Sequence, residues 1–158
     1  MGETRWLSDD EQQAWRSFLV ATNLLYDRLD RELQRDAGFP HGYYEILVRL
    51  SEAPDRRLRM SQLADRSQSS RSRISHAVSR LEESGWIRRE SCPTDRRGSF
   101  AVLTDRGFAA LEAAAPGHVE GVRRHVFDTL TDEQVVQLRT ISQALVSHLS
   151  EETPTTDG

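Results

Sequence analysis

The feature that most limits the fold of this chain is a change in the spacing of its apolar residues. Helical spacing predicts a short helix over 62–66 and a longer one over 70–84. Alternating spacing then predicts two short strands, 86–90 and 100–103, joined by a polar loop over 91–99. A helix pair followed by a β-hairpin is the order of elements in a winged helix-turn-helix lobe.

The residues at the predicted helix ends agree with this order. Ser61 is suited to cap the short helix, and Ser69 or Ser70 the longer one. Gly85 ends the longer helix, as glycine does when the chain must adopt a left-handed conformation. Just before the helix pair, residues 57–60 alternate like a very short strand.

Long helices are predicted on both sides of the lobe. Ser8 and Glu11 form a predicted capping box, and the helix that they open ends before Gly38 and Pro40. A second helix is predicted from His41. A helix opening at Thr104 and Asp105 contains Pro116 and Gly117, which predict a kink or break there. A last helix follows a capping box over 131–134.

The predicted fold class is mainly α with a small β-hairpin wing. The first and last helices carry apolar stripes that a single lobe leaves exposed, and pairing of two chains would bury them. We therefore expect a winged helix-turn-helix with flanking dimerisation helices. The expected division is an N-terminal dimerisation helix in 1–40, a DNA-binding lobe in 41–106, C-terminal dimerisation helices in 107–150 and a disordered tail in 151–158.

Charge is distributed unevenly along the chain. The whole sequence has a net charge of −4, which taken alone disfavours a nucleic-acid partner. Residues 56–106, however, contain 12 Arg and six acids, a net charge of +6, whereas the remainder carries −10. A basic segment between acidic ends is typical of proteins that bind nucleic acids.

One face of the helix over 70–84 is predicted to meet DNA. Ile74, Val78 and Leu81 define its buried side, and small hydroxyl side chains with Arg and His lie opposite or at the edges. Small hydroxyls permit close approach to base edges, and Arg can bond to guanine with two donors. The candidate DNA-binding residues here are Ser69, Ser70, Ser72, Arg73, Ser75, His76, Ser79 and Arg80.

The hairpin loop supplies the second candidate contact. Arg96 and Arg97 lie beside Gly98 near its tip, where Arg can reach phosphates or the minor groove. Asp95 is expected to orient a neighbouring guanidinium group, because a carboxylate cannot bind a phosphate.

The spacing of these motifs resembles that of the MarR family of bacterial transcription regulators. The matching residues are Leu63-Ala64, Arg80-Leu81-Glu82 with Gly85, Asp95-x-Arg97, and Val102-Leu103-Thr104-x-x-Gly107. The resemblance covers about residues 8–150. It implies a homodimer that binds a pseudo-palindromic DNA site as a ligand-responsive repressor, with Asp95 and Arg97 as the wing pair.

Family members often respond to small aromatic acids or phenols. The residues expected to line such a pocket are Trp15, Arg16, His41, Tyr43 and Tyr44. Some members sense peroxides through a cysteine in the first helix, so a redox regulator using Cys92, beside the wing, is one alternative. A helical protein-interaction module without DNA binding is another.

Other classes of function find little support in the sequence. No GxSxG, P-loop or GxGxxG motif is present, so we do not expect an enzyme. The five histidines form no HxxxH or HExxH motif, and neither a metal nor a cofactor is expected. Without an apolar run of membrane-spanning length or a signal peptide, the expected location is the cytoplasm.

Overall fold

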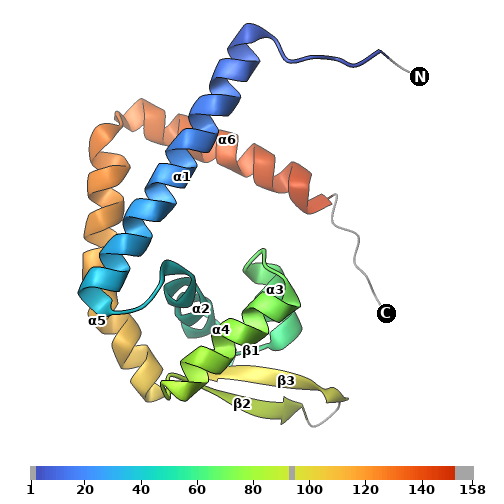
Figure 1. The fold of residues 1–158 in the computed structure, drawn as a ribbon, viewed down its shortest axis with the longest axis vertical. Coiled ribbons are helices and arrows are strands. Elements are labelled where there is room, and N and C mark those ends of the chain that lie inside the picture. The colour runs from blue at the N-terminus through green and yellow to red at the C-terminus, as the bar shows by residue number, and fades with distance from the viewer. Residues whose placement is uncertain (1–2, 93–94, 152–158) are drawn as a thin grey trace. The chain divides into compact units, whose positions relative to one another are not determined.

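A computed structural model describes the backbone of residues 3–92 and 95–151, and the side chains of these residues except 95–97 and 151. The chain divides into two units, one up to Val119 and one from Glu120. The expected tail beyond 151 lies outside the described residues. Figure 1 shows the elements, which are α1 (Asp9–Ala37), α2 (His41–Ser51), η1 (Pro54–Arg56), β1 (Arg57–Arg59), α3 (Met60–Arg66), α4 (Arg71–Glu83), β2 (Ile87–Cys92), β3 (Asp95–Leu103), α5 (Asp105–His125), η2 (Phe127–Thr129) and α6 (Asp132–Glu151).

These elements confirm the predicted fold class, mainly helical with a small antiparallel sheet in a winged helix-turn-helix. The first capping box is formed as predicted: the Glu11 N–H donates to the Ser8 hydroxyl at 3.2 Å, and the Ser8 N–H donates to the Glu11 carboxylate at 2.7 Å. α1 ends at Gly38, whose φ of 81° is left-handed. The capping box of α6 is also present, between Thr131 and Gln134.

The helix-turn-helix consists of α3 and α4. Ser70 is the cap of α4, because its hydroxyl accepts the Arg73 N–H at 3.2 Å. The prediction that Ser61 caps α3 is wrong, since that helix begins at Met60, two residues before the predicted start. The side chain of Gln62 accepts the Arg59 N–H at 3.2 Å and takes over this role.

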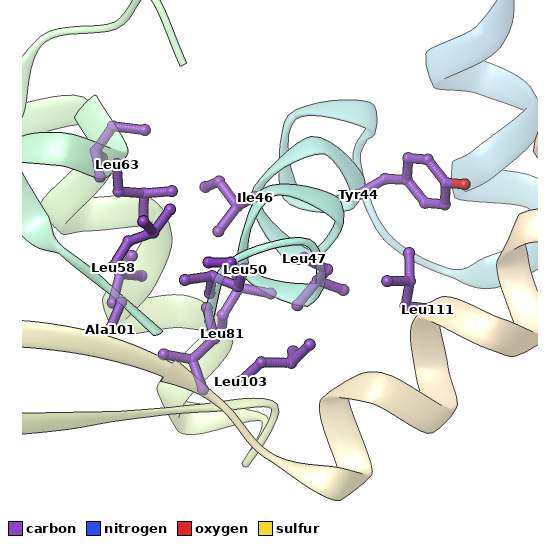
Figure 2. Packing of buried hydrophobic residues seen from close by; sticks show 14 of the residues in the cluster. Tyr44, Ile46, Leu47, Leu50, Leu58, Leu63, Leu81, Ala101, Leu103 and Leu111 are labelled. Atoms are coloured by element: carbon purple, nitrogen blue, oxygen red, sulfur yellow. The ribbon is translucent and has the colours of Figure 1, made fainter. Parts of the chain in front are cut away.

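The core of the first unit forms around α2. Leu47 and Leu50 are fully buried, and Figure 2 shows them among side chains of α4, β3 and α5, including Leu81, Leu103 and Leu111. Full burial of one such leucine stabilises the fold by about 1.5–3 kcal/mol relative to exposure. The lobe is therefore held by one apolar core that includes both fully buried leucines of α2.

The hairpin differs in length from the prediction. The strands β2 and β3 extend to Cys92 and from Asp95, so most of the expected loop over 91–99 is strand. Strand pairing is formed by backbone hydrogen bonds, which need no apolar pattern, so polar residues in the hairpin concealed it. The sheet has the order β1-β3-β2, and all pairs are antiparallel.

The expected break at Pro116 does not occur, because α5 continues through it to His125. Pro116 and Gly117 are exposed, and a proline within a helix removes one backbone hydrogen bond. The rest of this 21-residue helix tolerates that loss. Val126 and Phe127 lie beyond the end of α5, and Phe127 begins η2.

The start of α5 packs closely against the turn after α4, and we expect the stability of the fold to depend on this contact. A Cβ atom at Gly107 would overlap the Trp86 carbonyl and approach Leu103 Cδ1 to 2.8 Å. The Thr104 hydroxyl fixes the same turn, donating to the Gly85 carbonyl at 2.7 Å and accepting the Gly107 N–H at 3.0 Å. Gly107→Ala should therefore destabilise the protein by about 3 kcal/mol in urea unfolding.

Gly117→Ala is the matched control for this prediction, because a Cβ there meets nothing within 4 Å and lies in the same helix. It should stabilise the fold by about 0.5–1 kcal/mol. Equal unfolding midpoints for the two variants would refute the close packing at Gly107.

Candidate nucleic-acid interface

The helix α4 is anchored along one side and exposed along the other. Ile74, Val78 and Leu81 are buried, as the sequence predicts. The side chains of Ser72, Arg73, His76 and Arg80 are exposed. Arg80 forms an exposed ion pair with Glu83 at 3.0 Å, a contact that DNA can displace at little cost. A helix with this division can lay its polar side in the major groove.

Two of the predicted DNA contacts are engaged inside the lobe. Ser75 and Ser79 are half-buried, and both bond to Arg89 of β2. The Ser79 hydroxyl also donates to the Ser75 carbonyl at 2.9 Å. Ser70 caps the helix, and the Ser69 hydroxyl is buried without a hydrogen-bond partner in the described part of the chain.

The described residues of the sheet present a basic outer face. Arg57 and Arg59 of β1 lie over the ring of Phe100, with guanidinium carbons 5.1 and 5.7 Å from its centroid. Arg88 of β2 bonds to Glu90 at 2.7 Å. Sequence reasoning counted these arginines in the charge of the lobe but did not single them out. The alternation of Arg57 and Arg59 around buried Leu58 is the signal that places them on one face.

The predicted wing residues Asp95, Arg96 and Arg97 lie in the backbone of β3. Their side chains lie outside the described residues. Cys92, next to the tip, is buried at 6% exposure, which leaves little access for an oxidant.

The five predicted ligand-pocket residues lie on two helices of the first unit, Trp15 and Arg16 on α1 and His41, Tyr43 and Tyr44 on α2. Trp15 is half exposed on α1, and Arg16 beside it bonds to Gln12 at 3.2 Å. Tyr43 lines a different hollow from His41 and Tyr44.

The hollow that Tyr43 lines, which we call the α2–α4 hollow, has a cavity volume of about 320 Å³. The hydroxyl oxygens of Ser67 and Ser69 are buried there without a described hydrogen-bond partner, and Arg73 of α4 also lines it. Its remaining lining residues are Pro40, Gly42, Tyr43, Glu45, Ile46, Gln68, Ile74 and Ala77.

The hollow that His41 and Tyr44 line, which we call the α2–α5 hollow, has a cavity volume of about 270 Å³, and its lining includes two histidines. His41 is buried and its ring lies 5.3 Å from that of His118. Burial, and to a lesser extent His41, lowers the pKa of His118, and burial raises the pKa of Tyr44. The imidazole of His118 and the phenol of Tyr44 therefore favour their neutral forms.

The described residues contain no group of three or more His, Cys, Asp or Glu side chains placed to hold a metal ion. None of the described helices combines the length and the apolar character needed to cross a membrane.

A helix-turn-helix with an exposed polar side, followed by an antiparallel hairpin in a basic segment, defines the winged-helix class of DNA-binding proteins. Residues 37–98 match the sequence profile of the MarR family. Sco3205 is a MarR family transcriptional regulator from Streptomyces coelicolor that was crystallised in complex with DNA. Its sequence is 54% identical to this chain, and its structure matches with a TM-score of 0.90. The match covers 98% of this chain and 96% of Sco3205. AbsC, another MarR family regulator from that organism, is 44% identical, with a TM-score of 0.87 and coverage of 94% and 100%.

Curated relatives match over a shorter stretch. The regulator PecS from Dickeya dadantii is 32% identical over 89 residues, which are 56% of this chain and 53% of PecS. The repressor YetL from Bacillus subtilis is 32% identical over 97 residues, 61% of this chain and 58% of YetL. The chain thus spans a little over half the length of these two relatives. Together with the longer structural matches, they show that the chain belongs to the MarR family of transcription regulators, which are not enzymes.

Proposed function

We propose that this protein is a sequence-specific DNA-binding regulator whose helix α4 enters the major groove. The observation that carries the proposal is the division of α4, with Ile74, Val78 and Leu81 buried and a side of Ser72, Arg73 and His76 exposed. The segment 56–106 around it has a net charge of +6, suited to a polyanion. The 54% identical relative was crystallised in complex with DNA, which supports the same partner here.

Retention on DNA-cellulose tests this function against a protein-interaction module. Electrostatic binding to DNA weakens steeply with salt, because neutralised phosphates release their counterions. The protein should be retained at low salt and elute well before 1 M. Passage through the column at low salt would refute the proposal.

The proposed active form is a homodimer. This proposal is supported by exposed apolar side chains on α1, including Trp15 and Phe18, and on α6, including Ile141 and Leu145. Exposed stripes of this size mark interaction surfaces, and two-fold pairing is the commonest way to cover them. Two copies of α4 about 34 Å apart would read half-sites one DNA turn apart. The preferred site is then a pseudo-palindrome.

The proposed second contact is the wing. Asp95 and Arg97 match the wing pair of the family, and they lie in the backbone of β3 near the hairpin tip. Arg97 is proposed to grip the backbone or the minor groove beside the site. Such a contact supplies affinity more than sequence preference.

Arg97→Ala is expected to weaken operator binding at least about tenfold, because a charge-assisted hydrogen bond is worth about 1.5–3 kcal/mol. Gel-shift titration measures the loss, and thermal unfolding checks that the variant stays folded. Arg139→Ala, an exposed charge in α6, is the control for removing a positive charge and should bind normally. Wild-type affinity in Arg97→Ala would rule out the wing role.

The proposed regulation is repression by occlusion of a promoter, relieved by a small aromatic acid or phenol. The α2–α4 hollow suits such a ligand: Arg73 can pair with a carboxylate, and the buried hydroxyls of Ser67 and Ser69 offer hydrogen bonds. Because α4 forms one wall, a bound ligand would shift the population of DNA-binding conformations. Because the proposed partner is bacterial DNA, the proposed location is the cytoplasm.

A further inference from the structure

Arg89 of β2 bonds to the helix α4 at the side that carries no buried apolar residues. Its Nη2 donates to the Ser75 carbonyl at 2.9 Å and to the Ser79 hydroxyl at 2.8 Å. The Arg89 side chain is 30% exposed, compared with 56% for its neighbour Arg88. The strand thus reaches α4 through a half-buried guanidinium.

A second connection lies about one helical turn further along. The backbone N–H of Arg89 donates to Glu82 Oε1 at 3.1 Å, and its Nε lies 3.4 Å from Glu82 Oε2. Ser75, Ser79 and Glu82 follow the i, i+4, i+7 spacing of one helical face. One residue of the sheet therefore holds α4 at two points along its length.

These bonds hold α4 at a second side. Ile74, Val78 and Leu81, with the half-buried Ala77, anchor the helix to the core along one side. The Arg89 bonds lie beside this apolar side, where they oppose rocking of the helix about it. Base readout depends on such restraint, since hydrogen bonds weaken steeply with misalignment and a binding site must be held within about 0.5 Å.

We propose that Arg89 is a positioning residue for DNA recognition, fixing the angle at which α4 meets the major groove without itself binding a phosphate. The inference rests on the proposed DNA-binding function. It assigns Ser75 and Ser79 to the support of α4: the Ser79 hydroxyl donates its one hydrogen to Ser75 and accepts from Arg89. Base readout then belongs to Ser72, Arg73 and His76.

Arg89→Met tests the proposal, because it keeps an unbranched apolar side chain and removes the guanidinium. Arg88→Met is the matched control, since it removes the same charge from the next, exposed position of the strand. Affinities for a selected operator and for an unrelated duplex are measured by fluorescence anisotropy between about 0.05 and 0.2 M salt.

Arg89→Met should lose at least about tenfold in operator affinity and should keep its affinity for the unrelated duplex, so that the specificity ratio falls by the same factor. Its slope of log affinity against log salt should equal that of the wild type. The control should keep the wild-type specificity ratio, because any phosphate contact of the exposed Arg88 is lost equally from the operator and from the unrelated duplex. Because each subunit of the proposed dimer contributes one Arg89, a slope shallower by about 1.8 would show that Arg89 binds a phosphate, and would overturn the proposal. An unchanged specificity ratio would overturn it as well.

A second variant removes the two side-chain acceptors instead of the donor, in case Arg89→Met fails to fold by circular dichroism. Ser79→Ala combined with Glu82→Ala places good helix formers at both positions. This double variant should lower the specificity ratio severalfold, and a wild-type ratio would overturn the proposal. If the wild-type protein itself prefers no DNA sequence, the proposed function fails instead, so the two failures are distinguishable.

Discussion

Ile141→Asp is expected to dissociate the protein into monomers and to weaken operator binding at least about a hundredfold. Ile141 is 59% exposed on α6, in a stripe with Leu138, Leu145 and Leu149. In a two-fold dimer the substitution buries two carboxylates without partners, and burial of each costs several kcal/mol. A monomer reads one half-site, and its affinity approaches that of non-specific binding, which is typically at least about a thousandfold weaker.

Sedimentation equilibrium measures the dissociation, and anisotropy measures the operator affinity. Gln143→Asp is the matched control, since it adds the same charge on the other side of α6 and should leave a dimer that binds DNA normally. An Ile141→Asp variant that remains dimeric would remove this stripe from the proposed interface.

The second large effect is expected from Arg73→Ala, whose side chain is exposed on the polar side of α4. A bidentate contact between Arg and guanine is worth about 1–3 kcal/mol of discrimination, and a dimer makes it twice. The variant should therefore lose about 2–6 kcal/mol for the natural site. It should lose much less for sites changed at the base pair that Arg73 contacts.

Titration against a panel of single-base site variants measures this pattern. Arg71→Ala, at the start of the same helix, removes the same charge and should weaken all sites equally. If Arg73→Ala also weakens every site by the same factor, Arg73 contacts a phosphate and reads no base.

The helix-turn-helix was predictable from sequence because local signals fix it. Ser70 caps α4, Gly85 ends it with a φ of 73°, and Ile74, Val78 and Leu81 form its apolar line. Both predicted capping boxes of the long helices are likewise present. In each case the deciding contact lies within four residues along the chain, where spacing alone determines geometry.

Features that depend on distant residues were not predictable. Arg89 bonds to Ser75, 14 residues away, and helical spacing alone placed Ser79 on the DNA side. The length of the hairpin was missed because its strands pair through the backbone and not through an apolar pattern. The residues predicted for one ligand pocket were chosen for their chemical type, and in the structure Tyr43 and Tyr44 of α2 line two different hollows.

The division of charge within the chain, +6 over 56–106 and −10 elsewhere, is compatible with DNA binding despite the acidic total. Selection of genomic DNA fragments with the purified protein tests the central claim most directly. The account predicts that retained fragments share an inverted repeat with half-site centres about 10 base pairs apart. Retained fragments without any common sequence, or with a single unrepeated motif, would contradict a dimer that presents two copies of α4 to the major groove.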